Sequence, residues 1–195
     1  MIVQCKITPE KIVSLDENEI FVFGSNQAGV HGAGAAYTAS RHFGAEYGVG
    51  EGLTGRCYAF PTKDENIKTL GYSGIVKSLL NLEECVQKNP DKHFLITKVG
   101  CGLAGLSIKT VGRLFYFFIK RNYKNVSLPA EFLAINKFIA KSQIEELAIS
   151  NILEKKNWQH ISSNRLITTR PYPTFFWNEV DTWIDGFKNA IKFKK

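Results

Sequence analysis

The residues whose spacing suggests chemistry most directly are the glycines of Ile20–Ala36, which reads IFVFGSNQAGVHGAGAA. A short apolar segment ends at Gly24, a loop follows, and a helix-like pattern begins at Ala33. Nine of the 16 glycines lie between Gly24 and Gly55, so this backbone must turn sharply or pass close to another group. A glycine-rich turn from a strand into a helix presents backbone N–H groups to anions. The run therefore predicts a phosphate- or diphosphate-binding site.

A second loop of the same kind follows another apolar segment. Phe94–Val99 predicts a strand, the loop Gly100–Gly105 follows it, and Ser107 suits the N-cap of a helix running to about Arg121. Ligands of open α/β sheets bind outside the carboxyl ends of the strands, so we expect the two loops to form one cleft. The residues expected to bind the ligand are Gly24, Ser25, Asn26, Gly32, Ala33, Gly34, Ala35, Gly100, Cys101, Gly102, Leu103, Ala104 and Gly105.

The glycine loops do not match the common nucleotide-binding fingerprints. The glycines from Gly24 to Gly34 lack the GxGxxG spacing, and no acidic residue stands where a ribose partner belongs. A Walker loop is excluded because no Gly-Lys-Ser/Thr follows. The four cysteines show no CxxC spacing, so we predict no metal site and no disulfide framework. We also expect no cofactor.

Read together, the two loops resemble the macro domain, the ADP-ribose-binding module. In that family a strand ends in an asparagine, here Asn26, and a glycine-rich turn enters a helix, here His31–Ala36. The second loop, Cys101–Gly105, is similar to the phosphate loop of the family. The tracts YAFPTKD (Tyr58–Asp64) and VSLPAEF (Val126–Phe132) fit a divergent branch found in bacteria and phages. The resemblance covers about residues 1–133.

The resemblance implies a three-layer α/β/α domain with a mixed, largely parallel sheet, which binds ADP-ribose or a related NAD-derived nucleotide. It implies that Asn26 hydrogen-bonds the distal ribose. Two positions depart from the family pattern. Ala36 stands where hydrolytic members carry an acid, and Ala104 stands where an aromatic residue often covers the distal ribose. Asp16 is the nearest candidate for reading adenine, although its spacing does not fit well.

If the protein hydrolyses ADP-ribosyl linkages, another group must handle the protons. The candidate catalytic residues are Asn26 to orient the ribose, and His31 or Asp64 to transfer protons. Each has a structural alternative: a turn that its side chain satisfies for Asn26 and Asp64, and stabilisation of its own loop for His31. Glu46 and Glu51 are read as solvated loop charges. Cys101 is read as a small buried residue rather than a nucleophile, because the sequence suggests no histidine partner for it.

The pattern of elements that would position these loops alternates strands with helices, which is typical of βαβ units. Strands are expected at Ile20–Phe23, Cys57–Phe60 (stopped by Pro61), Phe94–Val99 and Val126–Leu128. Helices are expected at Ala33–Phe43 and Ile67–Gln87, and a loop at Phe43–Gly55.

The C-terminal part has a different texture, and we expect a helical, aromatic-rich extension at 134–195 beyond the domain at 1–133. Residues 1–106 carry 10 Lys/Arg and 11 Asp/Glu, whereas residues 107–195 carry 15 and 7, a net charge of +8.

The chain shows no secretory signal and no membrane-length apolar stretch, so we expect a cytoplasmic protein that does not enter a membrane. Three functions remain open: an ADP-ribosyl hydrolase, a non-catalytic module that reads or sequesters ADP-ribose-like signals, and a factor that binds nucleic acid or protein through the basic half.

Overall fold

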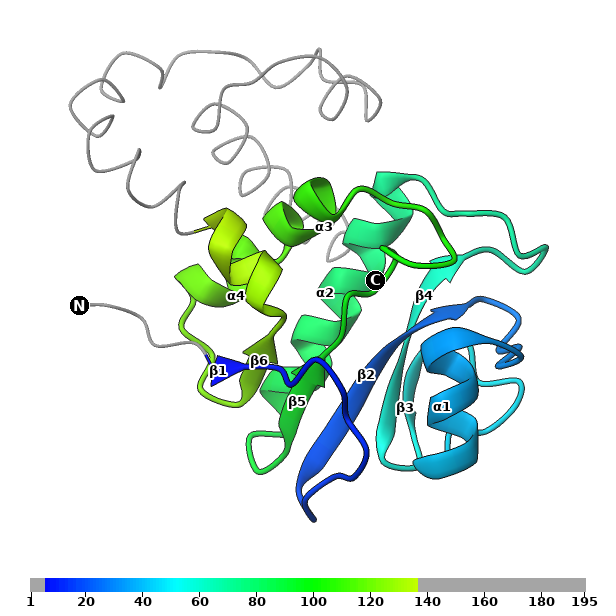
Figure 1. The fold of residues 1–195 in the computed structure, drawn as a ribbon, viewed down its shortest axis with the longest axis horizontal. Helices are drawn as coiled ribbons and strands as arrows, with labels where there is room; N and C mark the ends of the chain where they lie inside the picture. Colours follow the sequence, from blue (N-terminus) through cyan, green and yellow to red (C-terminus); the bar gives the residue numbers. More distant parts are fainter. Residues whose placement is uncertain (1–5, 137–195) are drawn as a thin grey trace, which may run out of the picture. The chain divides into compact units, whose positions relative to one another are not determined.

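The computed structural model describes residues 6–136, and within them six strands form one sheet in the order β1-β6-β5-β2-β4-β3 (Figure 1). The strands are β1 (Lys6–Ile7), β2 (Glu19–Asn26), β3 (Gly52–Thr54), β4 (Cys57–Lys63), β5 (His93–Ile96) and β6 (Val126–Leu128). The helices are α1 (Gly34–His42), α2 (Tyr72–Lys88), α3 (Ile108–Leu114) and α4 (Tyr116–Lys120). All neighbouring strands pair in parallel except β3 and β4, which are antiparallel. The mixed, mostly parallel α/β fold predicted from the sequence is therefore confirmed.

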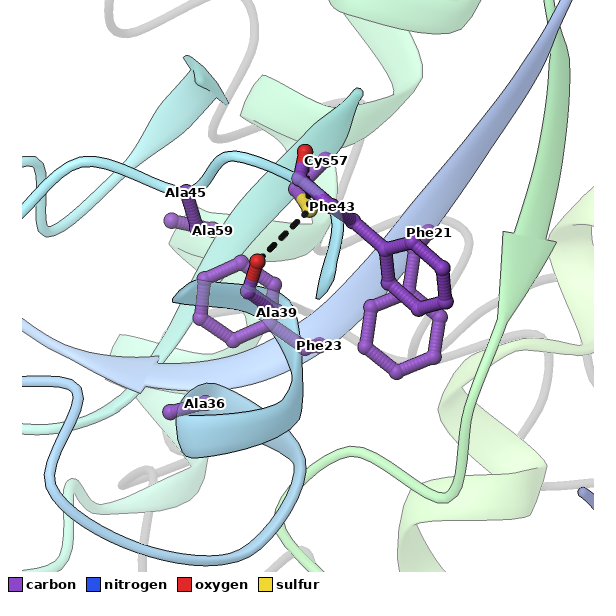
Figure 2. Packing of buried hydrophobic residues seen from close by; sticks show 8 residues of the cluster. All are labelled: Phe21, Phe23, Ala36, Ala39, Phe43, Ala45, Cys57 and Ala59. Atoms are coloured by element: carbon purple, nitrogen blue, oxygen red, sulfur yellow. Dashed lines mark hydrogen bonds between the residues drawn. The ribbon is translucent and has the colours of Figure 1, made fainter. Parts of the chain in front are cut away.

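One face of the sheet is covered by α1 (Figure 2). Side chains alternate along a strand, so Phe21 and Phe23 of β2 point to the same face, beside Cys57 and Ala59 of β4. The cluster that they form with α1 and the segment after it consists of Phe21, Phe23, Ala36, Ala39, Phe43, Ala45, Cys57 and Ala59. The small residues Ala36 and Ala39 let α1 lie close to the sheet, and this packing fixes the helix whose first turn follows the first glycine loop.

The opposite face of the sheet is covered by α2, α3 and α4, so the helices form two layers with the strands between them (Figure 1). Tyr58 and Phe60 are two residues apart on β4, so their side chains lie on the same face of the strand. Phe60 contacts Phe115, with ring centroids 6.0 Å apart. Phe115 in turn lies against Phe118 and Phe132. Burial of these large rings on one side and the smaller cluster on the other holds the carboxyl ends of β2, β4 and β5 at one edge.

Several element boundaries differ from the predicted ones for local reasons. β4 continues through Pro61, because β3 pairs with β4 only as far as Ala59 and β4 then has β2 as its neighbour strand on one side. The predicted loop 43–55 contains β3. α2 begins at Tyr72 rather than Ile67, which adopts a left-handed φ of 64°. The predicted single helix after Ser107 breaks at Phe115 into α3 and α4.

The predicted extension at 134–195 lies, beyond Asn136, outside the described residues. Among residues 6–136, we find no helix that is both long and apolar enough to span a membrane. Cys57, Cys85 and Cys101 are free thiols.

Candidate functional site

The two glycine loops lie at the same edge of the sheet and share one pocket of about 360 Å³. The edge is formed by the carboxyl ends of β2, β4 and β5, which are hydrogen-bonded neighbours in the order β5-β2-β4. The loop after β2 leads into α1, and the loop after β5 leads into α3. This topology brings together two segments that are more than 60 residues apart, as expected for the ligand edge of an open α/β sheet.

Asn26 shapes the first loop at the end of β2. Its Nδ2 donates to the carbonyl of Val30 at 2.7 Å, and its Oδ1 accepts from the Val30 N–H at 3.0 Å. The side chain is buried, with 7% exposure, and it lines the pocket. Two hydrogen bonds to one residue fix the loop that follows, and the amide keeps one N–H and one lone pair for a further partner.

The first loop is supported from behind by the segment Gly44–Gly50, away from the pocket. Gly29 has φ 67°, and a Cβ on it would lie 2.3 Å from the carbonyl carbon of Gly48. The Gly48 N–H donates to the Gly29 carbonyl at 2.9 Å. Part of the glycine concentration therefore serves contact between two backbone segments of the protein, and not approach to a ligand.

The amino end of α1 opens into the pocket. Its N-cap, Ala33, makes no side-chain capping bond, and the first turn carries no acidic residue. Gly34, Ala35 and Ala36 line the pocket, and the first N–H groups of a helix have no partner within the helix. The same end carries the partial positive charge of the helix dipole, so this wall suits an anion.

The second loop forms the facing wall and closes on itself by short backbone bonds. The Cys101 N–H donates to the Lys98 carbonyl at 3.0 Å, and the Leu106 N–H donates to the Gly100 carbonyl at 2.9 Å. Gly100 has φ 76°, a left-handed conformation that favours glycine, and a Cβ there would lie 2.8 Å from Cδ1 of Leu106, whose side chain would have to move. At the tip, Leu103 reaches the first loop: a Cβ on Gly34 would lie 3.4 Å from its Cδ1.

Lys98 connects this pocket to a larger one. The larger pocket, of about 640 Å³, lies on the β5, β6 and β1 side and is bordered by the segment 7–13, by α1 and by residues 129–131. The two pockets share Ala35, Thr97 and Lys98 in their walls. The Lys98 ammonium lies 2.7 Å from a carboxylate oxygen of Glu131, and this hydrogen bond raises the pKa of Lys98 and lowers that of Glu131. A protonated lysine therefore stands where the two pockets meet.

The structure brings together most of the ligand-binding residues expected from the sequence. All of them line the smaller pocket except Cys101 and Gly105. Burial raises the pKa of the Cys101 thiol to about 11, and its Sγ lies 3.6 Å from the Val99 carbonyl. A thiol with that pKa is almost entirely protonated at neutral pH, which agrees with its reading as a packing residue.

His31, a candidate proton-transfer residue, lies behind the first loop. Its ring is buried at 4% exposure, meets the Phe23 ring edge-on at 5.1 Å, and has Nε2 3.0 Å from the Glu46 carbonyl oxygen. A carbonyl only accepts hydrogen bonds, so Nε2 carries the proton, and Nδ1 is buried without a partner among the described residues. His31 is absent from the pocket wall, although Val30 and Gly32 on either side belong to it. This placement favours a structural role.

Asp64, the other proton-transfer candidate, organises a turn. Its Oδ1 accepts from the N–H groups of Asn66 at 2.9 Å and Lys68 at 2.8 Å. The carboxylate is thus engaged with the backbone of its own turn and does not line the pocket. Neither candidate base faces the space between the glycine loops, and Ala36, which does, has no ionisable group.

Sequence reasoning missed several pocket residues: Val30, Thr62, Lys63, Ile67, Thr97, Lys98 and Val99. Lys98 lies two residues before the second glycine loop, near the end of the strand predicted at Phe94–Val99, and this position was a usable signal. Thr62 and Lys63 are the last residues of β4, which lies on the other side of β2 from β5, and their role depends on the strand order, which one sequence does not state. Ile67 was assigned to a helix, and its left-handed turn had no visible signature.

The described residues contain no cluster of three or more His, Cys, Asp or Glu side chains that would hold a metal ion. Comparison of the chain with protein-family models, curated proteins and solved structures returned no match.

Proposed function

We propose that the protein binds ADP-ribose, or a closely related NAD-derived nucleotide, along the carboxyl edge of the sheet. The observation that carries the proposal is the juxtaposition of an uncapped helix terminus, two glycine loops and Lys98 around one pocket that continues into a larger one. The resemblance of the two loops to those of macro domains points in the same direction.

The order of the strands suggests how such a ligand would lie. The larger pocket borders β6, β5 and α1, and its apolar residues, including Phe21 and Phe43, suit a nucleobase. The junction at Lys98, opposite the α1 terminus, suits the diphosphate. The smaller pocket continues towards Asn26 and Lys63 at the ends of β2 and β4, where the distal ribose would lie.

Within this proposal we favour a reader of ADP-ribosylated macromolecules over a hydrolase. The geometry excludes both candidate groups for proton transfer, because His31 is buried behind the loop and Asp64 is engaged in its turn. Ala36, at the position where hydrolytic macro domains carry an acid, has no ionisable group. A general base must come within hydrogen-bond reach of the proton that it removes, directly or through one water. The expected activity is therefore binding with little or no turnover. We place this activity in the cytoplasm.

Calorimetry with ADP-ribose, ADP, AMP and ribose 5-phosphate tests the binding proposal. We expect saturable binding that is tightest for ADP-ribose and weakest for ribose 5-phosphate. Absence of saturable binding at millimolar ADP-ribose would contradict it. Release of ADP-ribose from ADP-ribosylated protein and nucleic acid, measured for the parent, Asn26→Ala and His31→Ala, distinguishes a reader from a hydrolase. Rapid release by the parent that His31→Ala abolishes would identify His31 as a base.

The basic second half supports a second candidate, binding of nucleic acid. Residues 107–195 carry a net charge of +8, which favours an anionic macromolecule. If the partner is nucleic acid, its affinity should fall steeply with salt concentration. A mobility-shift titration of modified and unmodified oligonucleotides at two salt concentrations distinguishes recognition of the ADP-ribose group from charge attraction alone.

A further inference from the structure

The segment after β4 forms a tight turn that meets the mouth of the smaller pocket. Asp64 holds this turn through the two bonds from its Oδ1 to the backbone N–H groups of Asn66 and Lys68. The Asp64 N–H also donates to the Lys68 carbonyl at 2.8 Å. Thr69 Oγ1 donates to the Ala104 carbonyl at 2.8 Å, which ties the turn to the second glycine loop. The turn is therefore fixed relative to the second glycine loop.

Ile67 occupies the centre of this turn in an unfavourable conformation. Its φ is 64°, a region that β-branched residues rarely adopt. The residue is 44% exposed and lines the pocket. Neither core burial nor backbone preference accounts for isoleucine here, since glycine or asparagine would suit the turn better. What isoleucine adds at this position is an aliphatic side chain at the pocket.

Leu103 supplies a second aliphatic group from the second glycine loop. It is 72% exposed, lines the same pocket, and has its Cδ1 3.4 Å from the Cβ position of Gly34. The same pocket is also lined by the polar side chains of Asn26, Thr62 and Lys63 and by backbone groups of the two glycine loops. The pocket thus combines hydrogen-bonding groups with the two exposed aliphatic side chains of Ile67 and Leu103.

We propose that Ile67 and Leu103 form an apolar cap that packs on the C–H face of the distal ribose, and that Asp64 is the positioning residue of this cap. The proposal rests on the ADP-ribose binding proposed above and names which part of that ligand the turn recognises. A pentose presents hydroxyl groups on its edges and C–H groups on its faces, so it matches this division of polar and aliphatic groups, whereas a terminal phosphate does not.

The test compares affinities for ADP-ribose and ADP, which lacks the distal ribose. Ile67→Gly relieves the backbone and removes the cap. We expect its melting temperature to stay equal or rise, its ADP-ribose affinity to fall about three- to tenfold, and its ADP affinity to stay within about twofold. Asn122→Gly is the matched control: Asn122 has φ 56° but does not line the pocket, so both affinities should be unchanged.

Asp64→Asn and Asp64→Ala separate positioning from catalysis. Asparagine keeps the Oδ1 acceptor of the turn, so Asp64→Asn should preserve the preference for ADP-ribose over ADP, and Asp64→Ala should reduce it. A parent protein that binds ADP-ribose and ADP equally, or an Ile67→Gly variant that keeps the parent's preference, would overturn the cap while leaving nucleotide binding intact. Failure of the parent to bind either nucleotide would overturn the proposed function, and the cap with it.

Discussion

The Lys98 ammonium lies 2.7 Å from the Glu131 carboxylate, across the gap between the end of β5 and the segment after β6. Both side chains are about 40% exposed, at 40% and 44%, so the pair is accessible to an incoming ligand. Glu10 lies farther away, at 3.9 Å. A surface ion pair of this kind stabilises the fold by less than about 1 kcal/mol, so its main consequence is to hold a lysine where the two pockets meet.

Replacing Lys98 should weaken nucleotide binding. If Lys98 contacts the diphosphate, Lys98→Ala removes a charge-assisted hydrogen bond of about 1.5–3 kcal/mol, and ADP-ribose affinity should fall roughly ten- to hundredfold. Glu131→Gln removes the competing carboxylate and should raise affinity modestly. Calorimetry at fixed ionic strength measures both changes.

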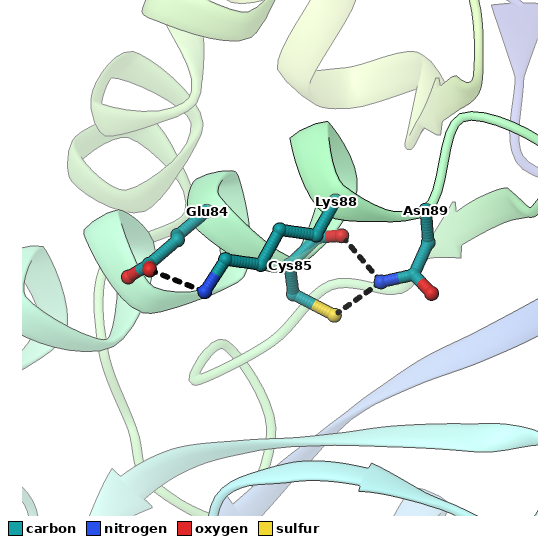
Figure 3. Close-up of polar contacts among 4 residues, drawn as sticks. All are labelled: Glu84, Cys85, Lys88 and Asn89. Atoms are coloured by element: carbon teal, nitrogen blue, oxygen red, sulfur yellow. Dashed lines mark hydrogen bonds and ion pairs between the residues drawn. The ribbon is translucent and has the colours of Figure 1, made fainter.

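Lys88→Ala provides the matched control for this pair. Lys88 makes an ion pair of the same length, 2.7 Å, with Glu84 on α2, but it lines neither pocket (Figure 3). Its removal changes the net charge as Lys98→Ala does, and affinity should be nearly unchanged. Equal losses for the two variants would mean that Lys98 acts only through the overall charge.

An acidic N-cap should compete with the ligand for the amino end of α1. Ala33 is exposed and has the extended backbone of an N-cap residue, with φ −153° and ψ 162°. Ala33→Asp should stabilise the protein by about 0.5–2 kcal/mol and lower ADP-ribose affinity, because its carboxylate occupies the N–H groups and repels phosphate. Ala33→Asn should stabilise similarly with a smaller loss of affinity. Thermal unfolding and calorimetry on both variants check this, and unchanged affinity in Ala33→Asp would place the phosphate elsewhere.

Replacing Asn26 should lower the stability of the protein, whether or not a ligand is bound. Asn26→Ala leaves the Val30 N–H and carbonyl without their partners, so the free energy of unfolding should fall by about 1–3 kcal/mol in urea. Asn89→Ala removes the bonds from Nδ2 to the Cys85 carbonyl at 2.8 Å and to the Cys85 Sγ at 3.7 Å, at the end of α2 (Figure 3). It should cost less, because the side chain makes no bond to a backbone N–H.

Asn26→Asp should make the stability of the protein depend on pH through the same contact with Val30. One carboxylate oxygen would accept from the Val30 N–H, but the other would face the Val30 carbonyl, and the two acceptors repel. Protonation lets the acid donate to that carbonyl, so the pKa of the new carboxyl should be raised in the folded state. The variant should therefore be least stable at neutral pH and recover as the pH falls towards 4, when measured against Asn26→Ala.

The sequence predicted the parts of the fold and site that depend on local pattern. Apolar runs gave β2, β5 and β6, and glycine spacing gave the two loops, because strands and turns of this kind are set by neighbouring residues. The orientation of His31 could not be predicted, since it depends on the Glu46 carbonyl 15 residues away. Lys98 and Ile67 join the site through strand order and a left-handed turn, which arise only after the chain has folded.

The Cys101 thiol should react slowly with alkylating reagents in the native protein, despite its place in the second glycine loop. Burial raises the pKa of its thiol to about 11, so the reactive thiolate forms only as the pH rises towards that value. Burial also raises the pKa of Cys57, to about 12. Iodoacetamide at pH 7.5 should therefore label both residues slowly in the folded state and rapidly in urea, with Cys101 labelling accelerated at pH 10.5, as followed by peptide mass spectrometry. Cys101→Ala should keep ADP-ribose affinity within about twofold, because the side chain lies outside the pocket wall, and fast labelling at neutral pH would instead identify an activated thiol beside the phosphate site.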